Sequence, residues 1–176
     1  MRSSEIASRI DESAADFALF ELMERVNSLG RASWLDIHKD SGVYVVYINN
    51  SKEPEFNHHG GISSCNPTKR ERLSEKWNGL NAKERMDIIY IGRGNVRSRV
   101  RALVRFGLGK TRKHGGGEWL WQIDNLQDLR ILISPCPLGL ECNYEKYLLD
   151  SFKNQHGDWP LANRQGGTGI GIWKPY

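Results

Sequence analysis

The stretch MDIIYIGRGNVRSRVRALVRFG, residues 86–107, joins two segments of opposite character. Residues 87–92 form a mostly apolar run that contains a tyrosine and stops at a glycine, which is typical of a buried strand. Residues 96–106 carry four arginines, Asn95 can cap a helix at their start, and Gly107 can end it. The stretch therefore predicts a strand that leads directly into a basic helix.

The segments before this stretch predict two further helices and a central strand. Residues 4–29 space their apolar side chains as an amphipathic helix does, and a second short helical piece is expected over residues 32–38. Residues 42–48, GVYVVYI, are β-branched and aromatic, which favours a central strand. Residues 68–85 predict a surface helix that is broken near Gly79.

After the stretch, the sequence predicts one more strand and one more helix. The strand is expected near residues 129–134, where Pro135 ends it, and the helix over about residues 139–155. The tail, residues 158–176, is rich in Gly and Trp and predicts irregular structure. The order of elements is helix, strand, long excursion, strand, helix, strand, helix, which predicts an α+β architecture with a small sheet covered by helices.

Composition excludes several classes of protein. The chain has 176 residues, of which 39% are hydrophobic, so it is long enough for a real core and is not disordered. No apolar run approaches the roughly 18 residues of a spanning helix, and the acidic N-terminus does not favour a secretory signal. Cys65, Cys136 and Cys142 follow no disulfide framework, so a reduced, cytoplasmic setting is expected.

The positive charge of the chain is local. Between Arg93 and His114 there are eight Lys or Arg and no Asp or Glu, which leaves 17 basic against 21 acidic residues elsewhere. Such a local excess is the usual mark of a site for a polyanion, most often the phosphates of a nucleic acid. A well-solvated basic helix is the alternative interpretation.

Five short motifs occur in order along residues 41–163. They are GVY at 42–44, IYIGRG at 89–94, NVRSRV at 95–100, YEKYLLDSF at 144–152 and PLAN at 160–163. Each motif alone is weak, but the ordered set resembles the GIY-YIG nuclease family. The resemblance implies an α+β fold with a small central antiparallel sheet of about three strands flanked by helices. It also implies a single nuclease domain over 1–176, with a core at 41–163, an N-terminal helical extension at 1–40 and an insertion at 50–86.

The resemblance further implies an active site with a metal. Members of the family hydrolyse phosphodiester bonds with one divalent cation per active site, Mg²⁺ or Mn²⁺, held mainly by one glutamate, which here matches Glu145. Tyr44 would be the general base or would orient the attacking water, and Tyr90 would lie beside it on the adjacent strand. Arg99 matches the arginine that is aimed at the scissile phosphate.

Two more residues match the pattern of the family, and one alternative stays open. Arg93 stands where many members have lysine and would stabilise a phenolate or the phosphate. Asn163 would bond to the backbone of the active site or to the phosphate. The loop from Tyr90 to Arg99 is one residue shorter than the commonest spacing, so Arg97 is an alternative for the catalytic arginine.

The remaining basic residues are expected to contact backbone phosphates of DNA. This set comprises Arg97, Arg101, Arg105, Lys110, Arg112 and Lys113. The first three are spaced four apart and share one helix face, whereas Arg99 points away from that face.

The chain also departs from the pattern of the family. Leu103 occupies the position where some members have His or Tyr, and His114 is a candidate substitute. His58, His59 and Cys65 of the insertion are too few and too irregularly spaced for a confident zinc site. Cys136 and Cys142 are expected to be packing thiols. Most of the tryptophans are expected in the core; base stacking is the alternative, and the residues concerned are Trp119, Trp121, Trp159 and Trp173.

The sequence therefore predicts a metal-dependent DNA endonuclease of the restriction or defence type, acting on duplex DNA. A homodimer would place one active site on each strand of the duplex. The alternatives are a toxin nuclease, a nuclease selective for branched or single-stranded DNA, and a nucleic-acid-binding module that retains the fold without the chemistry. The last would have no need of a carboxylate at Glu145.

Overall fold

The computed structural model describes residues 14–27, 34, 36–37, 39–49, 52–56, 66–81, 87–111 and 117–164. Across these ranges the chain forms an α+β fold with a four-stranded antiparallel sheet and four α-helices. The strands are β1 (Ala15–Ala18), β2 (Ser41–Ile48), β3 (Ile88–Asn95) and β4 (Leu129–Pro135). The helices are α2 (Leu19–Asn27), α3 (Pro67–Asn81), α4 (Val96–Gly107) and α5 (Glu141–His156).

The strands lie in the order β1-β4-β2-β3, and each neighbouring pair is antiparallel. β2 therefore lies between two partners, and residues 42–46 are buried, which explains why this strand consists almost entirely of β-branched and aromatic residues. Because β3 is an edge strand, its outer backbone groups need partners from outside the sheet.

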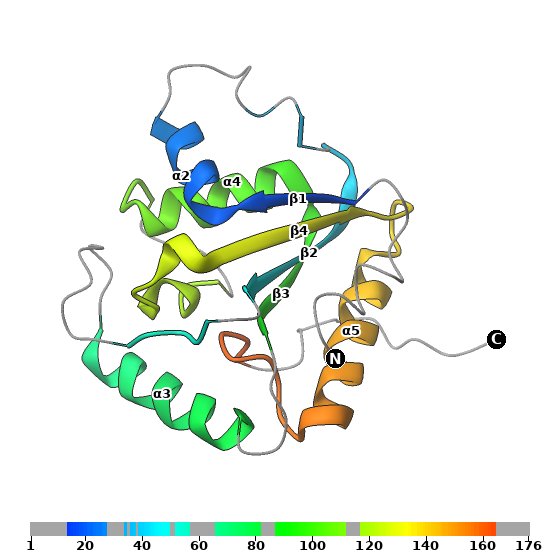
Figure 1. The fold of residues 1–176 in the computed structure, drawn as a ribbon. Coiled ribbons are helices and arrows are strands. Elements are labelled where there is room, and N and C mark those ends of the chain that lie inside the picture. Colours follow the sequence, from blue (N-terminus) through cyan, green and yellow to red (C-terminus); the bar gives the residue numbers. More distant parts are fainter. Residues whose placement is uncertain are drawn as a thin grey trace.

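Helices cover the sheet on two sides (Figure 1). α2 and α4 pack against each other above the sheet, and α5 lies below it against β3 and β2. α4 is amphipathic, and its buried residues are Val96, Val100, Leu103, Val104 and Gly107. As predicted, Asn95 caps this helix: its side-chain oxygen accepts a hydrogen bond from the backbone N–H of Ser98 at 3.1 Å.

The predicted long N-terminal helix is wrong over residues 15–18. This segment is β1, which pairs with β4, and only residues 19–27 of the described part are helical. Asp16 helps to hold this segment as a strand beside β4. Its carboxylate accepts hydrogen bonds from the hydroxyl of Tyr47 at 2.8 Å and from Arg130 at 3.0 Å. Pairing along the free edge of β4 outweighs the local helical pattern, and the sheet has four strands instead of about three.

The other predicted elements differ from the structure only in detail. α3 continues through Gly79 to Asn81 without a break. The glycine is exposed, and nothing lies within 4 Å of the place a Cβ would take. The third predicted strand and the last helix are present as β4 and α5. Of the short helix expected over 32–38, Trp34 has 3-10 geometry, while several of its residues lie outside the described ranges.

The insertion is docked on the core by a buried polar network. Arg70 of α3 forms an ion pair with Asp124 at 2.6 Å, and the two side chains are only 3% and 12% exposed. The backbone N–H of Asn66 donates to the side chain of Gln122 at 2.7 Å. Because a buried cation that loses its partner is strongly destabilising, this pairing fixes the start of α3 against residues 120–128.

Trp121 is a core residue, as expected, at 1% exposure. Trp119 and Trp159 are partly buried and pack against the core, while Trp173 and the residues of the suggested zinc site lie outside the described ranges. Cys136 and Cys142 are both free thiols. Among the described residues there is no helix of sufficient length and apolar character to cross a bilayer.

Gly92 has no room for a side chain. A Cβ there would lie 2.5 Å from Cζ of Tyr44 and 2.9 Å from Cε1 of Tyr90. The glycine of the YIG motif is thus required because two aromatic rings of the same sheet face cover it, and one of them belongs to its cross-strand partner Tyr44.

We predict opposite effects for two glycine-to-alanine substitutions. Gly92→Ala should destabilise the fold by about 1–3 kcal/mol, because both rings must move. The matched control Gly79→Ala should stabilise it by about 0.5–1 kcal/mol, since the position is helical and open. Chemical denaturation of both variants and the wild type measures the difference, and a Gly92→Ala protein as stable as the wild type would contradict this packing.

Candidate active site

The register of β2 and β3 brings the two motif tyrosines together. Tyr44 is the cross-strand partner of Gly92, and Tyr90 precedes Gly92 by two residues, so both rings lie on one face of the sheet. Their centroids are 6.0 Å apart with an interplanar angle of 47°. Tyr44 is fully buried, and the two phenols lie close enough for each to influence the pKa of the other.

Burial controls the acidity of Tyr44. Removal from water raises the pKa of Tyr44 well above its ordinary value, and the nearby Tyr90 raises it further, while the charge of Arg99 acts in the opposite direction. The pKa of Tyr90 is also raised, chiefly by burial. Both tyrosines are therefore neutral phenols at neutral pH, and Arg99 alone does not produce the phenolate that a strong general base requires.

Arg99 reaches this group from the first turns of α4. Its stem lies over Gly94, where a Cβ would be 3.1 Å from Cγ of Arg99, and Gly94 has a left-handed φ of 121°. The charge of Arg99 lowers the pKa values of Tyr44, Tyr90 and Glu145, which places all four groups within electrostatic reach of one another.

Glu145 enters from α5 and is held by Arg93. Nε of Arg93 lies 2.5 Å from Oε2 of Glu145, and the carboxylate side chain is 13% exposed. Burial raises the pKa of Glu145, and the hydrogen bond from Arg93 acts against this rise. Arg93 also donates to the sulfur of Cys142, one turn earlier on α5. The sequence predicted only a packing role for this thiol, although its spacing of three residues from Glu145 could have indicated a shared helix face.

Asn163 clamps the outer edge of β3 at the YIG motif. Its side-chain oxygen accepts from the backbone N–H of Ile91 and its amide donates to the carbonyl of Ile91, both at 2.9 Å. The N–H of Ala162 donates to the carbonyl of Ile89 at 2.8 Å. Asn163 thus makes the hydrogen bonds to β3 that a neighbouring strand would make. Two roles were expected for Asn163, a bond to the backbone of the active site or to the phosphate, and the structure shows the bond to the backbone.

The residues present are compatible with one divalent cation. Oε2 of Glu145 is paired with Arg93, whereas none of the described residues makes a hydrogen bond to Oε1. In the described part of the chain no group of three or more His, Cys, Asp or Glu side chains gathers that could hold a metal. A single free carboxylate oxygen fits Mg²⁺ or Mn²⁺ that retains most of its water and takes further oxygens from a phosphate.

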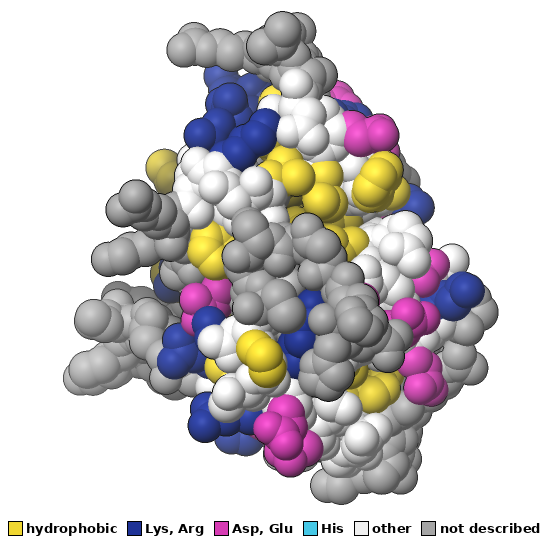
Figure 2. Space-filling model, turned by 90° about the vertical axis from the view of Figure 1, so that its left-hand side faces the viewer, with side chains coloured by type: hydrophobic (Ala, Val, Ile, Leu, Met, Phe, Trp, Pro, Cys, Tyr) yellow, Lys and Arg dark blue, Asp and Glu magenta, His cyan; other side chains and the backbone are white. Residues whose placement is uncertain are grey.

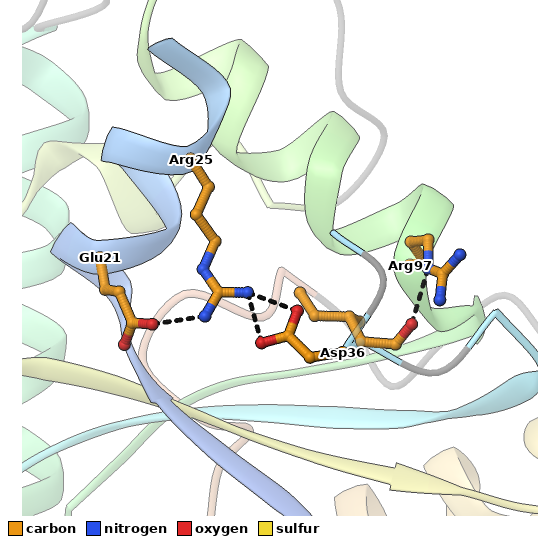
Figure 3. Close-up of polar contacts among 5 residues, drawn as sticks. Glu21, Arg25, Asp36 and Arg97 are labelled. Atoms are coloured by element: carbon orange, nitrogen blue, oxygen red, sulfur yellow. Dashed lines mark hydrogen bonds and ion pairs between the residues drawn. The ribbon is translucent and has the colours of Figure 1, made fainter. Parts of the chain in front are cut away.

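Arg97 faces away from the tyrosines. Its Nε donates to the carbonyl of Ile37 at 2.6 Å, and the same segment is held by Arg25, whose Nη1 lies 2.6 Å from Asp36 (Figure 3). Arg25 also bonds to Glu21 on its own helix (Figure 3). Arg97 therefore fastens residues 36–37 to α4, and Arg99 is the arginine of this helix that lies near Tyr44.

Two of the remaining basic residues, Arg101 and Arg105, lie farther along the same helix. α4 runs from the end of β3 toward the left of Figure 1, so each residue after Arg99 lies about 1.5 Å farther along its axis. Arg101 is exposed and Arg105 half-buried, while Nζ of Lys110 donates to the side chain of Asn27 at 2.6 Å. Figure 2 shows Lys and Arg side chains gathered at the top of this left-hand face. Arg112, Lys113 and His114 lie outside the described ranges.

Leu103 is fully buried in the core and therefore has a packing role. Comparison with known proteins found no matching family model, no matching curated protein and no matching solved structure. The case for a function therefore depends on the geometry of the residues themselves.

We predict that Tyr44→Phe keeps the fold but loses function. The change removes one buried hydroxyl and keeps the ring that packs against Gly92 and Tyr90, so it should alter the free energy of unfolding by about 1 kcal/mol or less. The same change should lower any catalysis by about 100-fold if the hydroxyl contacts the attacking water. Denaturation and activity are measured on the same preparation. A loss of stability above about 2 kcal/mol would instead show that the hydroxyl has a structural partner.

A second prediction concerns the pKa of Glu145. The hydrogen bond from Arg93 lowers this pKa, so Arg93→Gln should move it upward, and a higher pH will then be needed to ionise the carboxyl. Carbon-13 titration of the side-chain carboxyls, with Glu145→Gln for assignment, measures the shift. A control variant, Lys146→Gln, removes a cation that pairs with Asp150 on the surface and should leave the pKa of Glu145 in place. An unchanged or lower pKa in Arg93→Gln would contradict the pairing.

Proposed function

We propose that the protein is a metal-dependent endonuclease that hydrolyses phosphodiester bonds of DNA. The observation that carries the proposal is the meeting, within electrostatic reach of one another, of two tyrosines, an arginine and a carboxylate from β2, β3, α4 and α5. The residues that meet are Tyr44, Tyr90, Arg99 and Glu145. Structural packing alone does not require two phenols, a cation and a carboxylate to gather at one buried position.

Each residue has a task that suits its chemistry. The guanidinium of Arg99 can donate two parallel hydrogen bonds to the scissile phosphate and stabilise the charge that builds up on it. Tyr44 and Tyr90 can orient the attacking water, and because burial keeps Tyr44 neutral, orientation suits it better than strong proton abstraction. Glu145 would hold Mg²⁺ or Mn²⁺, which supplies positive charge to the phosphate and to the leaving oxygen. Arg93 would keep the carboxylate ionised and in place.

Duplex DNA cut at defined sequences is the substrate we favour. The exposed Arg101 and the half-buried Arg105 lie farther along α4 than Arg99, so they are suited to phosphates at a distance from the scissile one. The rigidly docked α3 adds a second element beside the core that a minimal nuclease would not need for the chemistry. Restriction or another defence role would follow from sequence-specific cutting, with a homodimer presenting one active site to each strand.

We predict that the purified protein cuts plasmid DNA in the presence of Mg²⁺ or Mn²⁺ and that EDTA abolishes cutting. Glu145→Gln and Arg99→Lys should each lower the rate by about 100-fold or more, because a lysine cannot replace the planar fork of donors. The matched control Asp150→Asn changes an exposed carboxylate on the same helix and should cut at the wild-type rate. The assay follows supercoiled, nicked and linear DNA on a gel.

The products decide among the kinds of nuclease. Discrete fragments support sequence-specific cleavage, whereas a metal-dependent smear or cutting confined to branched or single-stranded DNA would replace the restriction role and keep the chemistry. A Glu145→Gln protein that cuts as fast as the wild type would show that the carboxylate of Glu145 is not needed for cleavage. Intact binding without cleavage of any DNA would leave a binding module.

A further inference from the structure

Lys76 of the insertion helix α3 is a half-buried cation that the proposed chemistry does not use. Its side chain is 21% exposed and points at the segment that ends in Asn163. Nζ donates to the carbonyl of Pro160 at 3.1 Å and to the carbonyl of Asn163 at 3.2 Å, and Asp158 lies 3.8 Å away. Burial lowers the pKa of Lys76, and the charge of Asp158 opposes this effect.

The two carbonyls belong to one turn. The backbone N–H of Asn163 donates to the carbonyl of Pro160 at 3.0 Å, and Leu161 and Ala162 inside the turn are buried. The ammonium bridges both ends of this turn and so sets the position from which the side chain of Asn163 projects. That side chain makes the double hydrogen bond to Ile91, between Tyr90 and Gly92 of the YIG motif.

We propose that Lys76 is a positioning residue of the active site: it holds the turn at residues 160–163 so that Asn163 clamps β3 at the YIG motif. The insertion is then a part of the catalytic framework as well as a surface beside it. The route is short and continuous, from the ammonium of Lys76 through the backbone of Asn163 and its amide to the backbone of Ile91. Two measurements test this proposal. The cleavage kinetics rest on the proposed nuclease function, whereas the amide hydrogen exchange does not.

A phosphate contact is the competing role for a lysine on this helix. Lys76 is poorly placed for it, because its ammonium contacts the carbonyls of Pro160 and Asn163 and its side chain is mostly covered. Arg72, one turn earlier on α3, is exposed and is the natural comparison. A residue that only contacts DNA affects KM, whereas a residue that positions the tyrosines affects kcat.

The experiment compares Lys76→Met, Lys76→Arg and Arg72→Met in two measurements. The first is amide hydrogen exchange by NMR without DNA or metal, read at the backbone N–H of Ile91, which donates to Asn163. Lys76→Met should speed this exchange by about tenfold or more, whereas amides of β3 bonded to β2 keep their protection. Lys76→Arg should recover part of it, and Arg72→Met should match the wild type.

The second measurement is plasmid cleavage with Mg²⁺. Lys76→Met should lower kcat by about tenfold with little change in KM, and Lys76→Met should have no further effect in an Asn163→Ala background. Unchanged exchange at Ile91 in a folded Lys76→Met protein would overturn the proposal, as would a rise in KM alone. If Lys76→Met does not fold, Lys76→Gln, which keeps fewer donors, must show intermediate exchange, and wild-type exchange in it would also overturn the proposal. A wild-type protein that cuts no DNA would end the nuclease proposal while the exchange result still decides the role of Lys76.

Discussion

The candidate site depends on one constraint, the pairing of Tyr44 with Gly92 between β2 and β3. Because side chains alternate along a strand, a slip of one residue would turn Tyr44 to the opposite face of the sheet and separate it from Tyr90. The missing side chain at Gly92 lets both rings cover the backbone there. The tyrosines therefore meet because the backbone holds them, and Arg99 and Glu145 approach a position that the sheet has already set.

The edge position of β3 makes that constraint vulnerable, and the chain protects it from outside the sheet. An uncovered edge strand exposes unpaired N–H and C=O groups, frays and attracts other strands. Here the segment at residues 160–163 covers the edge next to the YIG motif, with the amide of Asn163 acting as a substitute for a strand. α3 supports this segment through Lys76, while α3 itself is anchored by the buried ion pair of Arg70. A long insertion thereby contributes to the rigidity of a site to which it adds no chemical group.

Sequence patterns were reliable where local chemistry and tertiary packing agree. The apolar run before Gly92, the cap at Asn95 and the glycine at Gly107 predicted their elements correctly, because a buried strand and a capped helix each have a local signature. They failed at residues 15–18, where the apolar spacing suits a helix but pairing with β4 and the bonds of Asp16 favour a strand. The role of Arg97 also could not be foreseen, because the carbonyl of Ile37 that it binds lies 60 residues away in the chain.

By itself, the sequence determined the types of most elements, the basic character of α4 and the set of candidate site residues, since these follow from residue identity and short spacings. Only the tertiary structure decided which of these residues meet. It separated Arg99 from Arg97, paired Glu145 with Arg93, buried Tyr44 and joined Lys76 to Asn163. Contacts of this kind link distant parts of the chain, and their strength depends on burial and on the exclusion of water. Neither of these is a property of any local stretch of sequence.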